Sequence, residues 1–94
     1  MKTVTRKIGQ NRGKPRLWLE GAILTAAGFK RGDKWTLVEH SDGLAIVADK
    51  NGKRKIAGTD ARPIIDITGG SLGHIGLCET VEVVALPQLI NVKG

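Results

Sequence analysis

RLWLEGAILTAAGFKRGDKWTLVEHSDGLAIVA, residues 16–48, is the stretch that decides the fold of this chain. Its apolar start predicts a strand, followed by the helix-forming run Ala22–Ala27 and by Gly28, a residue type that commonly ends a helix in the left-handed conformation. Lys30–Asp33 carries a Gly-Asp pair and is typical of a turn. Two further apolar runs flank Ser41–Gly43, and this pattern predicts a β-hairpin.

Parts of this stretch resemble the swapped-hairpin proteins of the AbrB, MazE and SpoVT type, and most closely the SymE-like branch. The residues that carry the resemblance are Leu17–Gly21, Leu24, Ala27–Asp33 and Leu44–Val47. The resemblance implies a fold that is mainly β with short helices, an AbrB-like β-barrel in which swapped hairpins interlock two halves. It also implies a role in binding DNA.

The composition predicts one small domain. The 94 residues are 40% hydrophobic with only three aromatic side chains, so Ile, Val and Leu must fill the core. No apolar run approaches the roughly 20 residues of a membrane span, and the N-terminus lacks the apolar centre of a signal peptide. A single cysteine cannot form an internal disulfide, which favours the reducing cytoplasm.

Positive charge is concentrated at the N-terminus. Residues 1–16 contain six Lys or Arg side chains and no acid. Because this segment has little apolar content and Pro15 disfavours a helix before it, we expect an extended, partly mobile arm. Its cations would bind nucleic-acid phosphates by releasing condensed counterions, or they would form a solvated tail that only aids solubility. Residues 3–5 could also add a strand at a sheet edge.

A second basic group surrounds Asn51-Gly52. This pair predicts a type I′ turn that joins residues 46–49 to residues 53–56 in a hairpin with a cationic tip. The tip would contact phosphates, or its cations would protect a sheet edge from pairing. A third group lies at the turn around Asp33, whose carboxylate could instead pair with a neighbouring cation.

These groups supply the predicted nucleic-acid-binding residues. They are Arg6, Lys7, Arg12, Lys14, Arg16, Lys30, Arg31, Lys34, Lys50, Lys53, Arg54 and Lys55. Arg12 and Arg16 are the candidates for reading a minor groove, since an arginine on a flexible arm can enter it.

The pattern begins again beyond residues 58–63, which we interpret as a linker. Ile64–Ile67 predicts a strand, Ser71 the N-cap of a short helix, and residues 80–92 a hairpin that turns at Pro87. We therefore expect the basic arm 1–16, followed by one domain, 17–94, made of the half-repeats 17–57 and 64–94.

Aligning Gly28 with Gly76 matches Leu24 with Leu72, Phe29 with Leu77 and, in the hairpins, Leu44 with Leu89. One half is too short to hold a core alone. A single chain would then supply both halves as a monomeric pseudo-dimer, unless whole chains pair again as a homodimer.

Catalytic and metal-binding patterns are missing from the sequence. His40 and His74 have no partners at metal-ligand spacing, and neighbouring turn positions cannot make a relay of His40, Ser41 and Asp42. Cys78 follows the end of the predicted helix, where we expect it to pack rather than to act as a reactive thiol. We therefore expect neither an enzyme nor a cofactor.

The sequence favours a small DNA-binding protein of bacterial, phage or mobile-element type, acting as a transcription regulator or antitoxin-like factor. The first alternative is a protein-binding module, such as an antitoxin, an inhibitor or an accessory subunit of a nucleic-acid enzyme. It would use the acidic second half and Trp18 or Trp35, which we otherwise expect in the core or an interface rather than stacked on bases. The second alternative is a SymE-like RNA-binding toxin.

Overall fold

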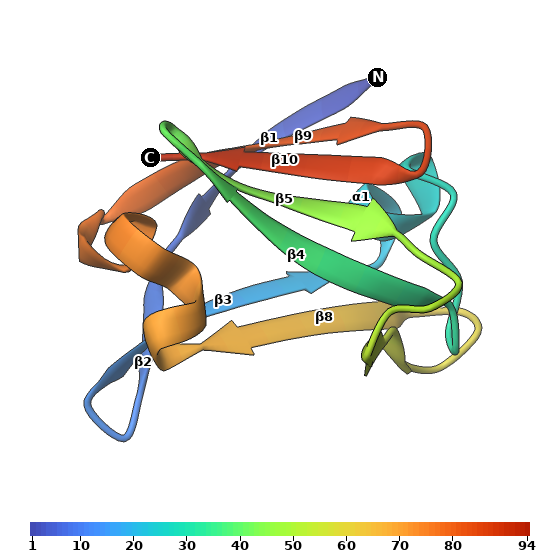
Figure 1. Ribbon diagram of the computed structural model, residues 1–94, viewed down its shortest axis with the longest axis horizontal. Coiled ribbons are helices and arrows are strands. Elements are labelled where there is room, and N and C mark those ends of the chain that lie inside the picture. The colour runs from blue at the N-terminus through green and yellow to red at the C-terminus, as the bar shows by residue number, and fades with distance from the viewer.

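The computed structural model describes all of residues 1–94 and contains two antiparallel β-sheets and two short helices (Figure 1). The six-stranded sheet has the order β1-β9-β10-β5-β4-β6, and the four-stranded sheet has the order β2-β3-β8-β7. Neither sheet closes on itself, so the β-barrel that the resemblance implies is not formed. The strands are β1 (Lys2–Lys7), β2 (Gly9–Asn11), β3 (Lys14–Glu20), β4 (Lys34–His40), β5 (Gly43–Ala48), β6 (Arg54–Lys55), β7 (Ala57–Gly58), β8 (Pro63–Thr68), β9 (Thr80–Leu86) and β10 (Leu89–Lys93). The helices are α1 (Ala22–Ala26) and the 3₁₀ segment η1 (Gly69–Leu77).

Nineteen buried apolar residues form one core, to which strands of both sheets and both helices contribute. Alternation along the strands directs these side chains inward: Leu17 and Leu19 of β3 are fully buried, and so are Ile90 and Val92 of β10. The helices α1 and η1 lie at opposite ends of the molecule in Figure 1. Neither helix has the length and apolar character that crossing a membrane would require.

The end of α1 forms as predicted. Gly28 has a φ of 82°, the N–H of Phe29 donates to the carbonyl of Leu24 (3.0 Å), and the N–H of Gly28 donates to that of Thr25 (3.0 Å). These two bonds make a Schellman motif, which satisfies carbonyls left free at the helix end. The following residue, Phe29, is buried in the core. The predicted hairpin is also present, because β4 pairs with β5 from Trp35–Ala48 to His40–Gly43.

The N-terminal segment is not a free arm, and that prediction is wrong. Lys2–Lys7 pairs with β9 along its whole length, and Gly9–Asn11 pairs with β3. The alternative of an edge strand at residues 3–5 is therefore confirmed. Arg12 and Gly13 both have positive φ (54° and 80°), as a type I′ turn requires, and they connect β2 to β3.

The hairpin predicted around Asn51-Gly52 is also wrong. β6 pairs with β4, through Lys34–Lys55 and Trp35–Arg54, and not with β5. Asn51 and Gly52 are not among the positive-φ residues. Glycine is needed at position 52 for another reason: a Cβ there would collide with the backbone of Trp35, over which the loop passes. The expected linker, residues 58–63, instead forms the turn of the β7–β8 hairpin, in which Gly58 pairs with Pro63.

Two matching segments connect the sheets at their edges. β1 and β2 are separated only by Ile8, and β6 and β7 only by Ile56, so each segment runs from the six-stranded sheet into the four-stranded sheet. Both isoleucines pack on the core. The sequences also match, with Arg6–Gly9 reading RKIG and Arg54–Ala57 reading RKIA.

The remaining elements follow the same order twice. β3, α1, β4 and β5 are followed later by β8, η1, β9 and β10, and the corresponding strands pair with each other: β3 with β8, and β5 with β10. Hairpin pairing places His40 opposite Gly43 and Leu86 opposite Leu89. This register matches the buried Leu44 with Ile90, so the sequence alignment of Leu44 with Leu89 is wrong by one residue.

The second helix differs from the prediction. Thr68 occupies the N-cap of η1, and the hydroxyl of Ser71, the predicted cap, instead accepts a hydrogen bond from Arg54 (3.0 Å). Gly76 does not have positive φ, and Leu77 is 91% exposed, whereas Phe29 is 1% exposed. Leu77 therefore does not take the place of Phe29, although Leu24 and Leu72 are both buried as expected.

Candidate nucleic-acid interface

The candidate site is a group of five cations at the β6 edge of the six-stranded sheet, here called the β4–β6 basic cluster: Lys34, Lys50, Lys53, Arg54 and Lys55. At its centre, Lys34 of β4 is paired directly opposite Lys55 of β6. Both side chains are exposed, and neither forms an ion pair. Like charges in directly opposite positions destabilise a sheet, so this pair costs stability unless an anion lies between them.

The two carboxylates nearest this cluster in the sequence stabilise turns. Asp33 accepts a hydrogen bond from the N–H of Lys30 (2.8 Å), and Asp49 accepts one from the N–H of Asn51 (2.9 Å). Neither carboxylate forms an ion pair with a lysine or arginine. Five cations against two carboxylates leave this region with a net charge of +3.

The turn before β4 adds further positive charge. Backbone bonds hold it against the segment after β6: the N–H of Gly32 donates to the carbonyl of Ile56 (2.9 Å), and the N–H of Ile56 donates to that of Asp33 (2.9 Å). Lys30 is exposed beside the cluster, whereas Arg31 forms an ion pair with Asp60 (3.2 Å).

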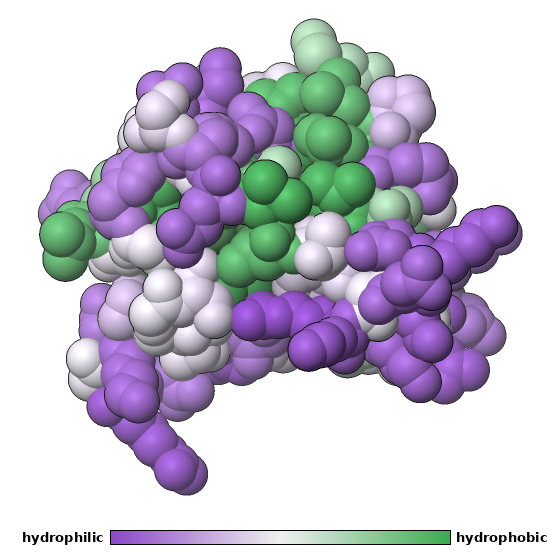
Figure 2. Space-filling model, in the orientation of Figure 1, coloured by the Kyte–Doolittle hydropathy of each residue, from purple (hydrophilic) through white to green (hydrophobic).

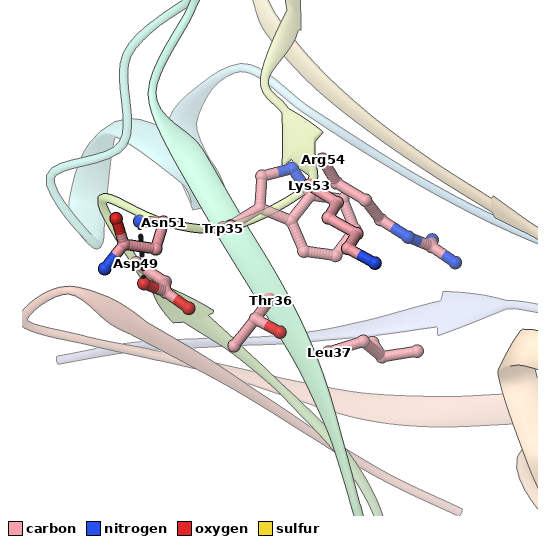
Figure 3. Close-up of a pocket in the computed structure, with 8 residues that line it drawn as sticks. Trp35, Thr36, Leu37, Asp49, Asn51, Lys53 and Arg54 are labelled. Carbon is pink, nitrogen blue, oxygen red and sulfur yellow. Dashed lines mark hydrogen bonds between the residues drawn. The ribbon is translucent and has the colours of Figure 1, made fainter.

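A shallow pocket of about 350 Å³ lies between β4 and the loop that precedes β6. Figure 3 shows Lys53 and Arg54 beside the ring of Trp35, with Thr36 and Leu37 on β4 and with Asp49 and Asn51 on the other side. The volume is at the lower end of the range for small-ligand sites. Its lining offers an ammonium, a guanidinium and a hydroxyl as donors to one anionic group, while the Asp49 carboxylate of the same lining accepts a hydrogen bond from the N–H of Asn51.

Arg54 is held in position by two contacts. Its guanidinium lies 5.3 Å from the centroid of the Trp35 ring, and its Nη2 donates to Ser71 Oγ (3.0 Å). Trp35 is buried, which confirms the expectation of a core position, and its Nε1–H has no hydrogen-bond partner. Because no carboxylate neutralises Arg54, its charge stays available to an incoming anion.

The other predicted cations lie elsewhere. Arg6 and Lys7 belong to β1, at the opposite edge of the six-stranded sheet from β6. Arg12 and Lys14 lie at the β2–β3 turn. Figure 2 shows hydrophilic side chains projecting at the lower left, where Figure 1 places this turn, and at the right, where the loop after β5 lies. The structure therefore divides the predicted cations between separate regions.

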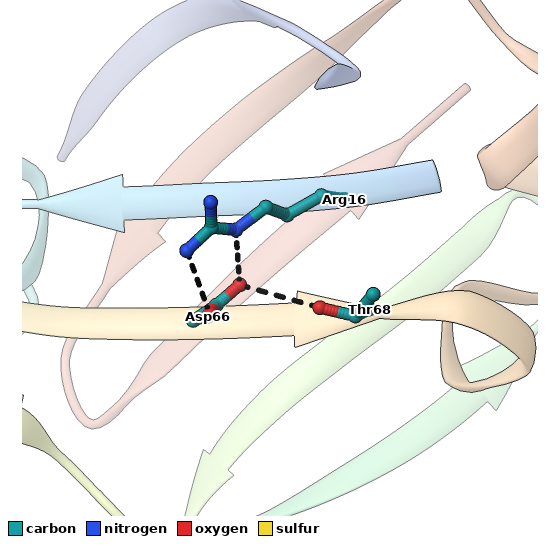
Figure 4. A network of polar contacts seen from close by, with 3 residues as sticks. All are labelled: Arg16, Asp66 and Thr68. Carbon is teal, nitrogen blue, oxygen red and sulfur yellow. Dashed lines mark hydrogen bonds and ion pairs between the residues drawn. The ribbon is translucent and has the colours of Figure 1, made fainter. Parts of the chain in front are cut away.

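Arg16 is not on a flexible arm, so the physical basis for placing it in a minor groove is wrong. Its Nε and Nη2 donate to the two carboxylate oxygens of Asp66 at 2.9 and 3.0 Å, and Thr68 Oγ1 lies 3.5 Å from the same carboxylate (Figure 4). The hydrogen bond to Asp66 raises the pKa of Arg16, although burial acts in the opposite direction. Arg16 remains charged throughout the physiological pH range.

Other reactive side chains do not gather into a site. No group of three or more His, Cys, Asp or Glu side chains is placed as metal ligands would be. His40 Nε2 lies 2.7 Å from Asn91 Oδ1, and the backbone N–H of Asp42 donates to His40 Nδ1 (3.2 Å). Cys78 is partly buried against the core.

Comparisons with protein-family models, with curated proteins and with solved structures find no match to this chain.

Two features of the surface were not predicted from the sequence. The opposition of Lys34 and Lys55 depends on β6 pairing with β4, which no local pattern indicates. The exposure of Trp18, which we expected in the core or an interface, could have been found from alternation. Leu17 and Leu19 are both inward, so the residue between them must face outward.

Proposed function

We propose that this chain binds nucleic acid, duplex DNA in particular, and that the β4–β6 basic cluster holds the phosphates. The observation that carries the proposal is the pair of exposed lysines, Lys34 and Lys55, in directly opposite positions without a carboxylate partner. A phosphate between two ammonium groups would remove their repulsion and release condensed counterions from the DNA. The repulsion between Lys34 and Lys55, which lowers the stability of the free protein, is thereby relieved in the complex.

The surroundings of the pair support a backbone contact. Arg54 is held by Trp35 and Ser71, so little side-chain entropy is lost when it binds an anion. Lys50 and Lys53 are exposed on the adjoining loop and can follow neighbouring phosphates. Contacts of this kind position a protein on the duplex without reading its sequence.

The architecture that we propose is a single-chain pseudo-dimer of the AbrB-like swapped-hairpin type, which would act as a transcription regulator or antitoxin-like factor in the cytoplasm. Its support is the pairing of corresponding strands, β3 with β8 and β5 with β10. The matching segments Arg6–Gly9 and Arg54–Ala57 support it further. In this arrangement each half contributes strands to both sheets, so neither half has a complete core alone.

The test is the affinity for a labelled DNA duplex at low ionic strength, measured by fluorescence anisotropy. The triple variant Lys34→Ala, Lys53→Ala, Lys55→Ala should bind at least about tenfold more weakly, because phosphate contacts are removed. The matched control, Lys2→Ala, Lys7→Ala, Lys93→Ala, removes three other exposed, unpaired lysines and the same net charge. Equal losses in the two variants would contradict a local site, and no loss in the first would reject the cluster.

A second candidate function, as a protein-binding module, is favoured by the outer face of the six-stranded sheet. Val38 is 47% exposed there, and its cross-strand neighbour Ala45 is partly exposed. Figure 2 shows hydrophobic surface across the upper middle of this view. If a second copy of the chain covers the face, the molar mass in solution should be twice that of one chain, and Val38→Asp should halve it. A single-chain mass for the unaltered protein would exclude this homodimer.

A further inference from the structure

Trp18 is the aromatic side chain that the fold leaves exposed, and the proposed phosphate site does not use it. Phe29 and Trp35 are buried, whereas Trp18 is 39% exposed. It lies on the outer face of the four-stranded sheet, because its neighbours on β3 point into the core. β3 and β8 pair through five residues each, and Trp18 lies opposite Asp66 in the central pair.

A fixed guanidinium lies over the ring of this indole. Arg16 forms two parallel hydrogen bonds with Asp66 (Figure 4), and its guanidinium carbon lies 4.5 Å from the centroid of the Trp18 ring. A bidentate pair fixes the plane of the guanidinium. The side chain of Arg16 is nevertheless 33% exposed. The indole and the guanidinium stacked over it are therefore both partly exposed and in place before any ligand binds, and we call them the Trp18–Arg16 surface.

Neighbouring strands leave this surface open. β2 pairs with β3 only as far as Gly9, which lies opposite Arg16, so no residue of β2 is paired with Trp18. On the far side of β8 lies β7, which ends at Gly58. The outward-facing residue of β7 is Ala57, which pairs with Ile64 of β8. Glycine and alanine have no side chain long enough to cover the indole.

The two ends of β3 differ in the charge that they place beside this surface. Lys14 faces the same side as Arg16 and Trp18 because alternate residues of a strand share a face. Lys14 and the adjacent Arg12 are exposed and form no ion pair. At the other end, the Glu20 carboxylate and the Arg62 guanidinium form an ion pair (Oε2–Nε 3.7 Å), so that end has no unpaired cation for a phosphate. An anionic backbone would therefore lie toward Lys14.

We propose that the outer face of the four-stranded sheet binds unpaired nucleotides, with one base stacked on the Trp18–Arg16 surface and the adjoining phosphate at Lys14 and Arg12. Bases of single strands stack on aromatic rings and on guanidinium planes, while nearby cations contact the backbone. Bases inside a duplex cannot offer their faces in this way. Asp66 acts through Arg16 as a positioning residue. The inference extends the proposed function to a second surface with a different form of nucleic acid.

The experiment measures the binding of labelled oligothymidylate and oligouridylate, too short to pair, by fluorescence anisotropy. Trp18→Ala should weaken binding roughly ten- to hundredfold, because one base loses its stacking partner. Leu77→Ala, which truncates an exposed apolar residue of η1, is the matched control and should leave affinity unchanged. An abasic oligomer of equal length should bind the unaltered protein about as weakly as oligothymidylate binds the Trp18 variant.

Tryptophan fluorescence reports on the contact itself, since a base stacked on Trp18 quenches its emission while Trp35 stays buried. Quenching by oligothymidylate and none by the abasic oligomer supports the site, and the tighter of the two pyrimidine oligomers identifies DNA or RNA as the preferred chemistry. The proposal would be overturned if the Trp18→Ala and unaltered proteins bound oligothymidylate with equal affinity, or if the abasic oligomer bound the unaltered protein as tightly as oligothymidylate does. Duplex affinity should be unaffected by Trp18→Ala, so this outcome is separate from the test of the β4–β6 basic cluster.

Discussion

The two halves of the chain, residues 2–48 and residues 54–93, share a strand order but differ in what they place at corresponding positions. The shared positions are mostly internal: Ile8 and Ile56, Leu24 and Leu72, and Leu44 and Ile90 all contact the core. The differences lie mainly at helix ends and on surfaces. The common pattern therefore specifies the fold, whereas the features proposed for binding belong to one half or to the contact between them.

The end of the helix shows the largest difference. In the first half Phe29 follows a Schellman motif and is 1% exposed, whereas Leu77 of the second half is 91% exposed. We expect Phe29→Ala to lower the free energy of unfolding by about 3–5 kcal/mol, since it leaves a cavity in the core. Leu77→Ala should change it by less than about 0.5 kcal/mol. Urea denaturation of both variants measures the contrast, and similar losses would show that the helix ends are equivalent.

The next largest change in the free energy of unfolding is expected at Gly28, at the end of the same helix. Gly28 has a φ of 82°, and a Cβ there would lie 2.7 Å from Gln88 Nε2. Gly28→Ala should therefore cost about 1–2 kcal/mol, chiefly from the left-handed conformation. Gly70 of η1 is the matched control, because its φ is not positive and nothing lies within 4 Å of its Cβ position. If both substitutions have the same effect in urea, the Schellman motif contributes nothing to the difference.

A charge reversal tests the contact between the halves. Lys34 of the first half opposes Lys55 of the second, whereas at the other edge Lys7 opposes the uncharged Thr80. Lys34→Glu should raise the free energy of unfolding by about 0.2–1 kcal/mol, because an opposite-charge pair replaces a like-charge pair. The same variant should bind duplex DNA more weakly. A variant that loses stability, or binds DNA as before, would contradict the role given to this pair.

Local sequence signals predicted the local parts of this fold well. Gly28 after an alanine-rich run predicted the end of α1, and the apolar runs around Ser41–Gly43 predicted the β4–β5 hairpin. Both depend on contacts between residues close in sequence. The prediction at Asn51-Gly52 was wrong because a distant strand, β4, pairs with β6. Distant pairing also made residues 2–7 an edge strand, since only β9 shows where that segment belongs.

The site was predicted only as a list of cations. Sequence clustering placed Lys53, Arg54 and Lys55 in one predicted group, and the structure adds Lys34 directly opposite Lys55. The sequence could not show that the carboxylate of Asp66, fifty positions from Arg16, pairs with the Arg16 guanidinium. The second RKI segment was visible in the sequence, but its meaning depended on recognising the first as a strand and not as a tail.

The salt dependence of duplex binding tests the central proposal most directly, because it counts phosphate contacts and not only overall affinity. For the unaltered protein, log K should fall linearly with log salt concentration, by about 0.9 for each phosphate neutralised. The triple variant Lys34→Ala, Lys53→Ala, Lys55→Ala should show a slope smaller by about 2 to 3, if each lysine neutralises one phosphate. An unchanged slope would contradict the proposal that the β4–β6 basic cluster holds the DNA backbone.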